Sequence, residues 1–141
     1  MTRSGSATIA AMSDYSIVNI RESEDLAPKF GMPSDMKAHF PKRELNCEVG
    51  AVSLERLGPG FRTPFGHKHR RQEELYVIVA GSGRVKLDDE IVDVRQWDVV
   101  RVGPETMRNF EGGPDGLEVL AFGAPIAEEN DGEIVPGWWT D

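Results

Sequence analysis

The chain is poor in the residues that mark several classes of protein. It contains a single cysteine, Cys47, in 141 residues, so no disulfide can form within it and no thiolate cluster can hold a metal. Its longest apolar run, residues 75–80, is far shorter than the roughly 20 residues that a membrane-spanning helix needs. These absences predict a cytoplasmic protein that does not cross a membrane.

Basic residues are also in the minority. Lysine and arginine total 16 against 24 aspartate and glutamate residues, which gives a formal net charge of −8. Nucleic acids and anionic membrane surfaces both require a basic face, so neither is expected as a partner. The N-terminus also lacks the long apolar segment of a secretory signal.

The length suits a single domain with two flanking segments. Residues 1–14 are expected to be a flexible leader, residues 15–125 the domain, and residues 126–141 a tail. The tail contains Trp138 and Trp139, and a covered indole buries roughly 150–250 Å². Either the tail packs on its own domain or it contacts a second subunit, and a homodimer is expected.

Valine-rich runs alternate with turns from residue 45 onward. Strands are predicted over residues 47–57, 74–80, 84–87, 91–94, 99–102 and 117–122. Short strands at close spacing favour an antiparallel sandwich or barrel. Residues 81–83, Gly-Ser-Gly, predict a tight hairpin, and residues 112–116 predict another turn. Earlier in the chain, a strand over 15–22 and short helical turns, one of them over 34–43, are expected.

Two histidines separated by one residue, His67 and His69, precede a pair of carboxylates, Glu73 and Glu74. On an extended segment, residues i and i+2 point to the same face, so both imidazoles project into one space. A carboxylate at the start of the next strand can meet them there. Two imidazoles and a carboxylate form a ligand set for a divalent metal.

The segment 60–83 resembles the first motif of the cupin superfamily, in which a glycine, His-x-His, a glutamate and a second glycine stand at set spacings. The matching residues are Gly60 (one residue farther away than usual), His67, His69, Glu74 and Gly81. The resemblance covers roughly residues 45–125. It implies an all-β fold, the double-stranded β-helix or jelly-roll antiparallel barrel, with short N-terminal helical turns.

The second cupin motif is degenerate in this chain. Residues 97–109 match it, but Trp97 stands in place of a glycine and Arg108 in place of the third histidine. The resemblance implies three of the usual four metal ligands and a divalent transition metal (Fe, Mn, Ni or Zn), with the ligands His67, His69 and Glu74.

Arginine stays protonated and cannot coordinate a metal, which leaves three alternatives for Arg108. The side chain turns outward beside a three-ligand metal, it binds an anionic ligand that bridges to the metal, or it pairs with Glu74 and no metal binds. The corresponding functions are a metal-dependent dioxygenase or isomerase acting on a small anionic molecule, and a metal-free, non-catalytic barrel that binds or senses a small molecule.

Arg108, Tyr76 and Trp97 are the candidates for ligand binding at the mouth of the barrel. Core packing is the competing role for Tyr76 and Trp97. Glu73 is expected to be a solvated neighbour of the site. The remaining histidine, His39, completes a coordination sphere only if the N-terminal arm folds over the barrel.

Overall fold

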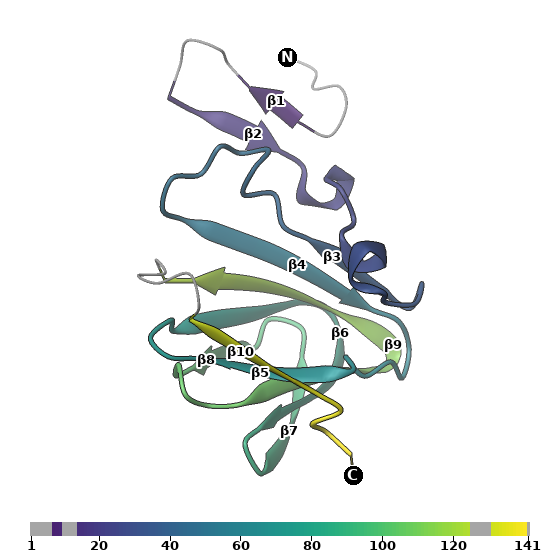
Figure 1. Cartoon of the computed structure of the whole chain (residues 1–141). Coiled ribbons are helices and arrows are strands. Elements are labelled where there is room, and N and C mark those ends of the chain that lie inside the picture. Colours follow the sequence, from purple (N-terminus) through teal and green to yellow (C-terminus); the bar gives the residue numbers. More distant parts are fainter. Residues whose placement is uncertain (1–6, 10–13, 125–130, 141) are drawn as a thin grey trace.

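A computed structural model shows the described residues as a curled eight-stranded antiparallel sheet, a separate two-stranded sheet and two single helical turns (Figure 1). The structure describes residues 7–9, 14–124 and 131–140. Its elements are β1 (Ala7–Ile9), β2 (Ser16–Val18), η1 (Ile20–Glu22), η2 (Ala27–Phe30), β3 (Met36–His39), β4 (Ala51–Leu57), β5 (Phe65–His69), β6 (Glu74–Leu87), β7 (Glu90–Arg95), β8 (Val99–Val102), β9 (Arg108–Gly123) and β10 (Gly132–Pro136). The all-β antiparallel barrel with short N-terminal helical turns is confirmed.

Two long strands, β6 and β9, form the frame of the barrel. They pair with each other along almost their whole lengths, and β4 and β5 flank β9. The first half of β6 pairs with β8 and its second half with β7. Each long strand therefore serves both halves of the curled sheet.

The hairpin predicted at residues 81–83 is wrong, and so is the turn at 112–116, because both segments continue within β6 and β9. The register between these strands shifts at Gly81, whose φ is 73°. A Cβ on Gly81 would lie 2.1 Å from the carbonyl oxygen of Gly116, so only glycine permits this approach of the two backbones. The glycines bend paired strands here, and the β6–β7 hairpin turns at Asp88 (φ 51°) instead.

The helix predicted over 34–43 is also wrong, because its centre is strand β3. Met36 and Ala38 are buried while Lys37 between them is exposed, which is the period of a strand. The first strand is shorter than predicted, since β2 ends at Val18 before η1 begins. The leader falls mostly at residues 1–6 and 10–13, outside the described residues, while its segment Ala7–Ile9 pairs with β2.

The core lies between the inward faces of the strands. It is made of Ala27, Met36, Ala38, Leu57, Tyr76, Ile78, Val85, Val94, Val102, Phe110, Leu117 and Val119. Among the described residues, no helix has the length and apolarity needed to span a membrane.

The described part of the tail covers its own barrel. Strand β10 pairs antiparallel with β5, and Trp139 beyond it is 5% exposed. The Trp139 ring lies under the guanidinium of Arg62, 4.1 Å from the ring centroid, and the ammonium of Lys86 stands 4.6 Å from the Trp138 ring. Cation–π contacts and burial therefore hold the two tryptophans of the tail.

Candidate metal centre

Strand β5 and the start of β6 bring two imidazoles and a carboxylate to one point inside the barrel. The Nε2 atoms of His67 and His69 each lie 3.1 Å from the same Glu74 oxygen, Oε1. One ligand atom from each of the three residues lies within 4.8 Å of the other two. The i, i+2 spacing on an extended segment thus produces the cluster expected from it.

Arg108 faces inward from β9, opposite His67 on β5, and its side chain is 0% exposed. Its Nη2 donates to Glu74 Oε1 at 2.6 Å, and its Nε donates to the Tyr76 hydroxyl at 3.1 Å. Its Nη1 donates to the carbonyl oxygens of Pro104 (3.2 Å) and Thr106 (2.8 Å). The outward alternative is therefore wrong. Four of the guanidinium's five N–H groups already have protein partners, so its fork is not open to a ligand.

Tyr76 belongs to both the core and the site. Its side chain is 4% exposed, and its hydroxyl donates to Glu74 Oε1 at 2.8 Å. Burial, reinforced by the negative charge of Glu74, raises the pKa of the Tyr76 phenol well above its usual value. The phenol is therefore a neutral hydrogen-bond donor to the carboxylate at neutral pH.

Trp97, the third candidate for ligand binding, lies in the turn between β7 and β8. Its φ is 74° and its side chain is 69% exposed. Its backbone N–H donates to the carbonyl oxygen of Ile78 at 2.7 Å, which fixes the turn and not the indole. Core packing is therefore wrong for this residue, and its role in ligand binding stays a prediction.

Two further residues near the motif lie outside the cluster. His39 is buried on β3, where its Nδ1 lies 3.2 Å from the carbonyl oxygen of Ser23. Glu73 pairs with Arg101 at 2.6 Å, and both side chains are largely solvated. Of the three histidines, only His67 and His69 meet a carboxylate in the barrel.

Four polar atoms surround Glu74 Oε1, which is more than the two hydrogen bonds that its lone pairs accept. Arg108 and Tyr76 already donate to this oxygen, which has two lone pairs, yet two imidazole nitrogens stand 3.1 Å away as well. Burial opposes ionisation, but the polar contacts from His67, His69 and Tyr76 hold the pKa of the Glu74 carboxyl well below its usual value. The carboxylate is therefore ionised, and both imidazoles direct Nε2 toward it, as ligands of one shared cation would.

Glu55 is an interior residue that the sequence motifs do not reveal. On β4 it stands between Ala38 of β3 and Val119 of β9, both of them core residues, so the register turns Glu55 into the barrel. Burial, opposed by the field of His67 and reinforced by that of Glu74, raises the pKa of its carboxyl. The inward alternation of β4 is visible in the sequence, but the proximity of Glu55 to His67 and Glu74 is not.

Asp131, in the tail, is the second residue that the motifs miss. Its side chain is 3% exposed, and its Oδ2 lies 3.2 Å from Nδ1 of His69. The two residues are far apart in the sequence, and no spacing rule connects them. Burial raises the pKa of the Asp131 carboxyl, but N–H donors of Gln72 and Arg71 and the neighbouring His69 lower it further, so the net shift is downward.

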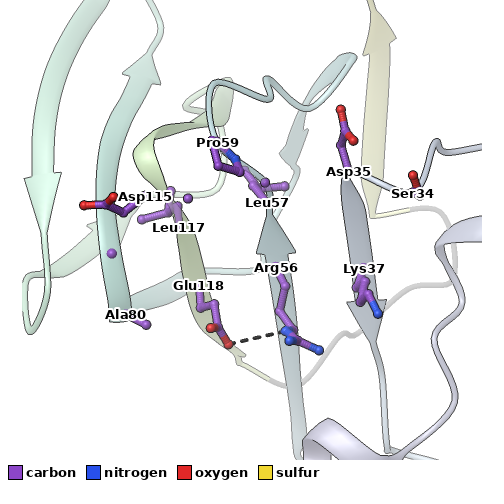
Figure 2. Close-up of a pocket in the computed structure, with 13 residues that line it drawn as sticks. Ser34, Asp35, Lys37, Arg56, Leu57, Pro59, Ala80, Asp115, Leu117 and Glu118 are labelled. Carbon is purple, nitrogen blue, oxygen red and sulfur yellow. Dashed lines mark ion pairs between the residues drawn. The ribbon is translucent and has the colours of Figure 1, made fainter.

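A hollow of about 330 Å³ lies elsewhere on the sheet, near the middle of β6 at Ala80, whereas Glu74 begins that strand (Figure 2). In the close-up, Arg56 and Glu118 extend from neighbouring strands and face each other, with a separation of 3.5 Å. Both cations (Lys37, Arg56) and anions (Asp35, Asp115, Glu118) line this hollow, and no metal-ligating cluster of the described residues lies in it. The His-His-Glu cluster is thus the stronger candidate site.

Comparison with known proteins identifies the fold. No family model matches the chain. An uncharacterized protein of Methanocaldococcus jannaschii is 34% identical over 70 residues, which make up 49% of this chain and 56% of the length of that protein. A cupin protein from Bacteroides fragilis superposes with a TM-score of 0.67 at 21% identity, covering 83% of this chain and 89% of that one.

The nucleoside dehydratase Pac13 has a similar structure. It superposes with a TM-score of 0.64 at 20% identity, covering 84% of this chain and 89% of that one. A Streptomyces variant of the same protein, with uridine, gives a TM-score of 0.65. At these identities the likeness establishes the fold and leaves the chemistry to the site. This protein has the cupin fold, with a His-His-Glu cluster inside its barrel that can bind a metal ion.

Proposed function

We propose that this barrel binds a divalent transition metal through His67, His69 and Glu74, and that it acts there on a small anionic organic molecule. The observation that carries the proposal is the approach of both Nε2 atoms to one carboxylate oxygen, 3.1 Å in each case, when that oxygen already accepts from Arg108 and Tyr76. A cation shared by the three ligands reduces the contacts on this oxygen from four to three, because the imidazoles then present lone pairs to the ion and not hydrogens to the carboxylate.

Two imidazoles and one carboxylate with open positions suit iron, manganese, nickel or zinc, and such an ion supplies Lewis-acid or oxygen chemistry when bound. Dioxygenation and isomerisation are the reaction classes that this ligand set favours. The residues of the chain have defined parts in it: Arg108 and Tyr76 hold the Glu74 carboxylate in place by hydrogen bonds of 2.6 and 2.8 Å. Their role is to orient a ligand atom of the metal.

Charge supports the anionic character of the ligand. A dication together with buried Arg108 carries three positive charges, which exceed the two negative charges of Glu74 and of Asp131 beside His69, and the contacts of Arg108 leave at most one N–H for a ligand. The attraction for an anion therefore comes from the net positive charge of the centre and not from a bidentate grip by the arginine.

Elemental analysis of the untagged protein tests the metal directly. We expect near-stoichiometric transition metal in the wild-type protein and its loss in His67→Ala. His39→Ala is the matched control, because it removes a buried histidine outside the cluster. Metal-free wild-type protein that also fails to take up Zn²⁺, Mn²⁺ or Fe²⁺ on dialysis would reject the proposal.

The alternative is a metal-free barrel that binds or senses a small molecule. The 2.6 Å ion pair between Arg108 and Glu74 favours it, since a positive charge already occupies one side of the carboxylate. The solved complexes of Pac13 with uridine make uridine a reasonable first probe. A rise in melting temperature with uridine or an organic acid in metal-free protein, without turnover, would favour this alternative.

A further inference from the structure

We propose that Asp131 is a positioning residue of the metal centre, whose carboxylate holds His69 so that its Nε2 lone pair points at the ion. This inference rests on the metal-binding function proposed above. It adds to the site a part of the C-terminal tail, which no motif connects with the histidines.

The imidazole of His69 stands between two carboxylates. Its Nε2 lies 3.1 Å from Glu74 Oε1, and its Nδ1 lies 3.2 Å from Asp131 Oδ2. Nδ1 is buried and has no well-aligned hydrogen-bond partner among the described residues, so Asp131 is the acceptor within its reach.

Proton counting shows why two carboxylates suit a metal ligand. A neutral imidazole carries one N–H and one lone pair. Without an ion, a neutral His69 can satisfy only one of the two carboxylates, and the other faces a lone pair. With an ion at Nε2, the single N–H lies on Nδ1 and points at Asp131, so both sides of the ring are satisfied. Histidines that bind metals commonly donate their other N–H to a carboxylate in this way.

The backbone holds Asp131 rigidly enough to orient the ring. Its carboxylate accepts from the N–H groups of Arg71 (2.9 Å) and Gln72 (3.1 Å), and its carbonyl accepts from the N–H of Arg70 (2.9 Å). Gly132 then pairs with His69 as β10 begins. Docking of the tail against β5 thus delivers one carboxylate to the metal centre.

The test measures Zn²⁺ affinity by competition with a chromophoric chelator in the wild-type protein, Asp131→Asn and Glu133→Gln. Asparagine keeps the shape but places an NH₂ group where only acceptors fit, so we expect binding about 10–100-fold weaker. Glu133 is the matched control, because it lies two residues away on the same segment and its side chain is 63% exposed. Asp131→Asn within twofold of the wild type would overturn the inference, as would an equal loss in Glu133→Gln.

A measurement on the wild-type protein makes the inference independent of how well the variant folds. Nitrogen NMR of the Zn²⁺-loaded protein should show His69 protonated at Nδ1 and bound through Nε2, and binding through Nδ1 would overturn the role of Asp131. A wild-type protein that takes up no Zn²⁺ removes the proposed metal function itself. Normal Zn²⁺ uptake with unchanged affinity in Asp131→Asn removes only the role of Asp131.

Discussion

Replacing Arg108 by methionine tests how the centre is held together. Methionine keeps much of the side-chain volume but removes the charge and the donors to Glu74, Tyr76 and two backbone carbonyls. The Arg108 side chain is 0% exposed and that of Glu74 14% exposed, so water can do little to replace the lost contacts. Breaking a buried ion pair by removing one partner costs about 3–5 kcal/mol. For a chain of this size the melting temperature should fall by roughly 10–17 °C.

Arg101→Met is the matched control for this substitution. Arg101 and Glu73 also pair at 2.6 Å, but their side chains are 67% and 46% exposed, and we expect a change within about 0.5 kcal/mol. The double variant Arg108→Met/Glu74→Gln should be less destabilised than the sum of its two single variants, because no buried charge is left unpaired. Equal losses in Arg108→Met and Arg101→Met, or additive losses in the double variant, would refute the reasoning.

Zn²⁺ affinity is a second measurement on Arg108→Met, and we expect it to rise although the stability of the variant falls. A guanidinium about 5 Å from a dication repels it by several kcal/mol at an effective dielectric constant of about 20. This repulsion exceeds the roughly 10–100-fold in affinity that the orienting contact of Arg108 with Glu74 is worth. Arg108→Met should therefore bind Zn²⁺ more tightly than the wild type, and saturating Zn²⁺ should recover much of its lost melting temperature. Weaker Zn²⁺ binding in this variant would mean that the arginine supports the metal ligands more than it repels the ion.

Three further predictions concern stability. The melting temperature of Glu55→Gln relative to the wild type should rise as the pH rises from 4 to 8. The pKa of the Glu55 carboxyl is raised in the folded chain, so its ionisation above the unfolded-state pKa destabilises the wild type and not the variant. Exposed Glu48→Gln is the control, and a pH-independent difference for Glu55→Gln would contradict the prediction. Gly81→Ala should cost roughly 3 kcal/mol or more in chemical denaturation because of its positive φ and its approach to Gly116, whereas Ser82→Ala should cost little. Trp139→Ala should cost about 3 kcal/mol, since the indole is 5% exposed; unchanged stability would show that the tail does not hold to the barrel in solution.

The class of fold and the three clustered residues of the site follow from local features of the sequence. Strand-length valine-rich runs favour an antiparallel sandwich or barrel, and the resemblance of residues 60–83 to the first cupin motif implies the barrel. The alternation of side chains along a strand puts His67 and His69 on one face. The glutamate that opens the next run completes the cluster. These features are local, because they depend on a period of two residues and on short spacings, and the residues His67, His69 and Glu74 meet as that local rule requires.

The surroundings of those three residues depend on tertiary contacts. The sequence left three arrangements open for Arg108, and only the pairing of β5 with β9 showed that its guanidinium turns inward to Glu74. Gly-Ser-Gly at 81–83 has the composition of a hairpin, but contact with the backbone of β9 makes it a bend within one strand. Asp131 reaches His69 only because the tail returns to β5. Such contacts join residues distant in the sequence, so no local period or spacing can encode them.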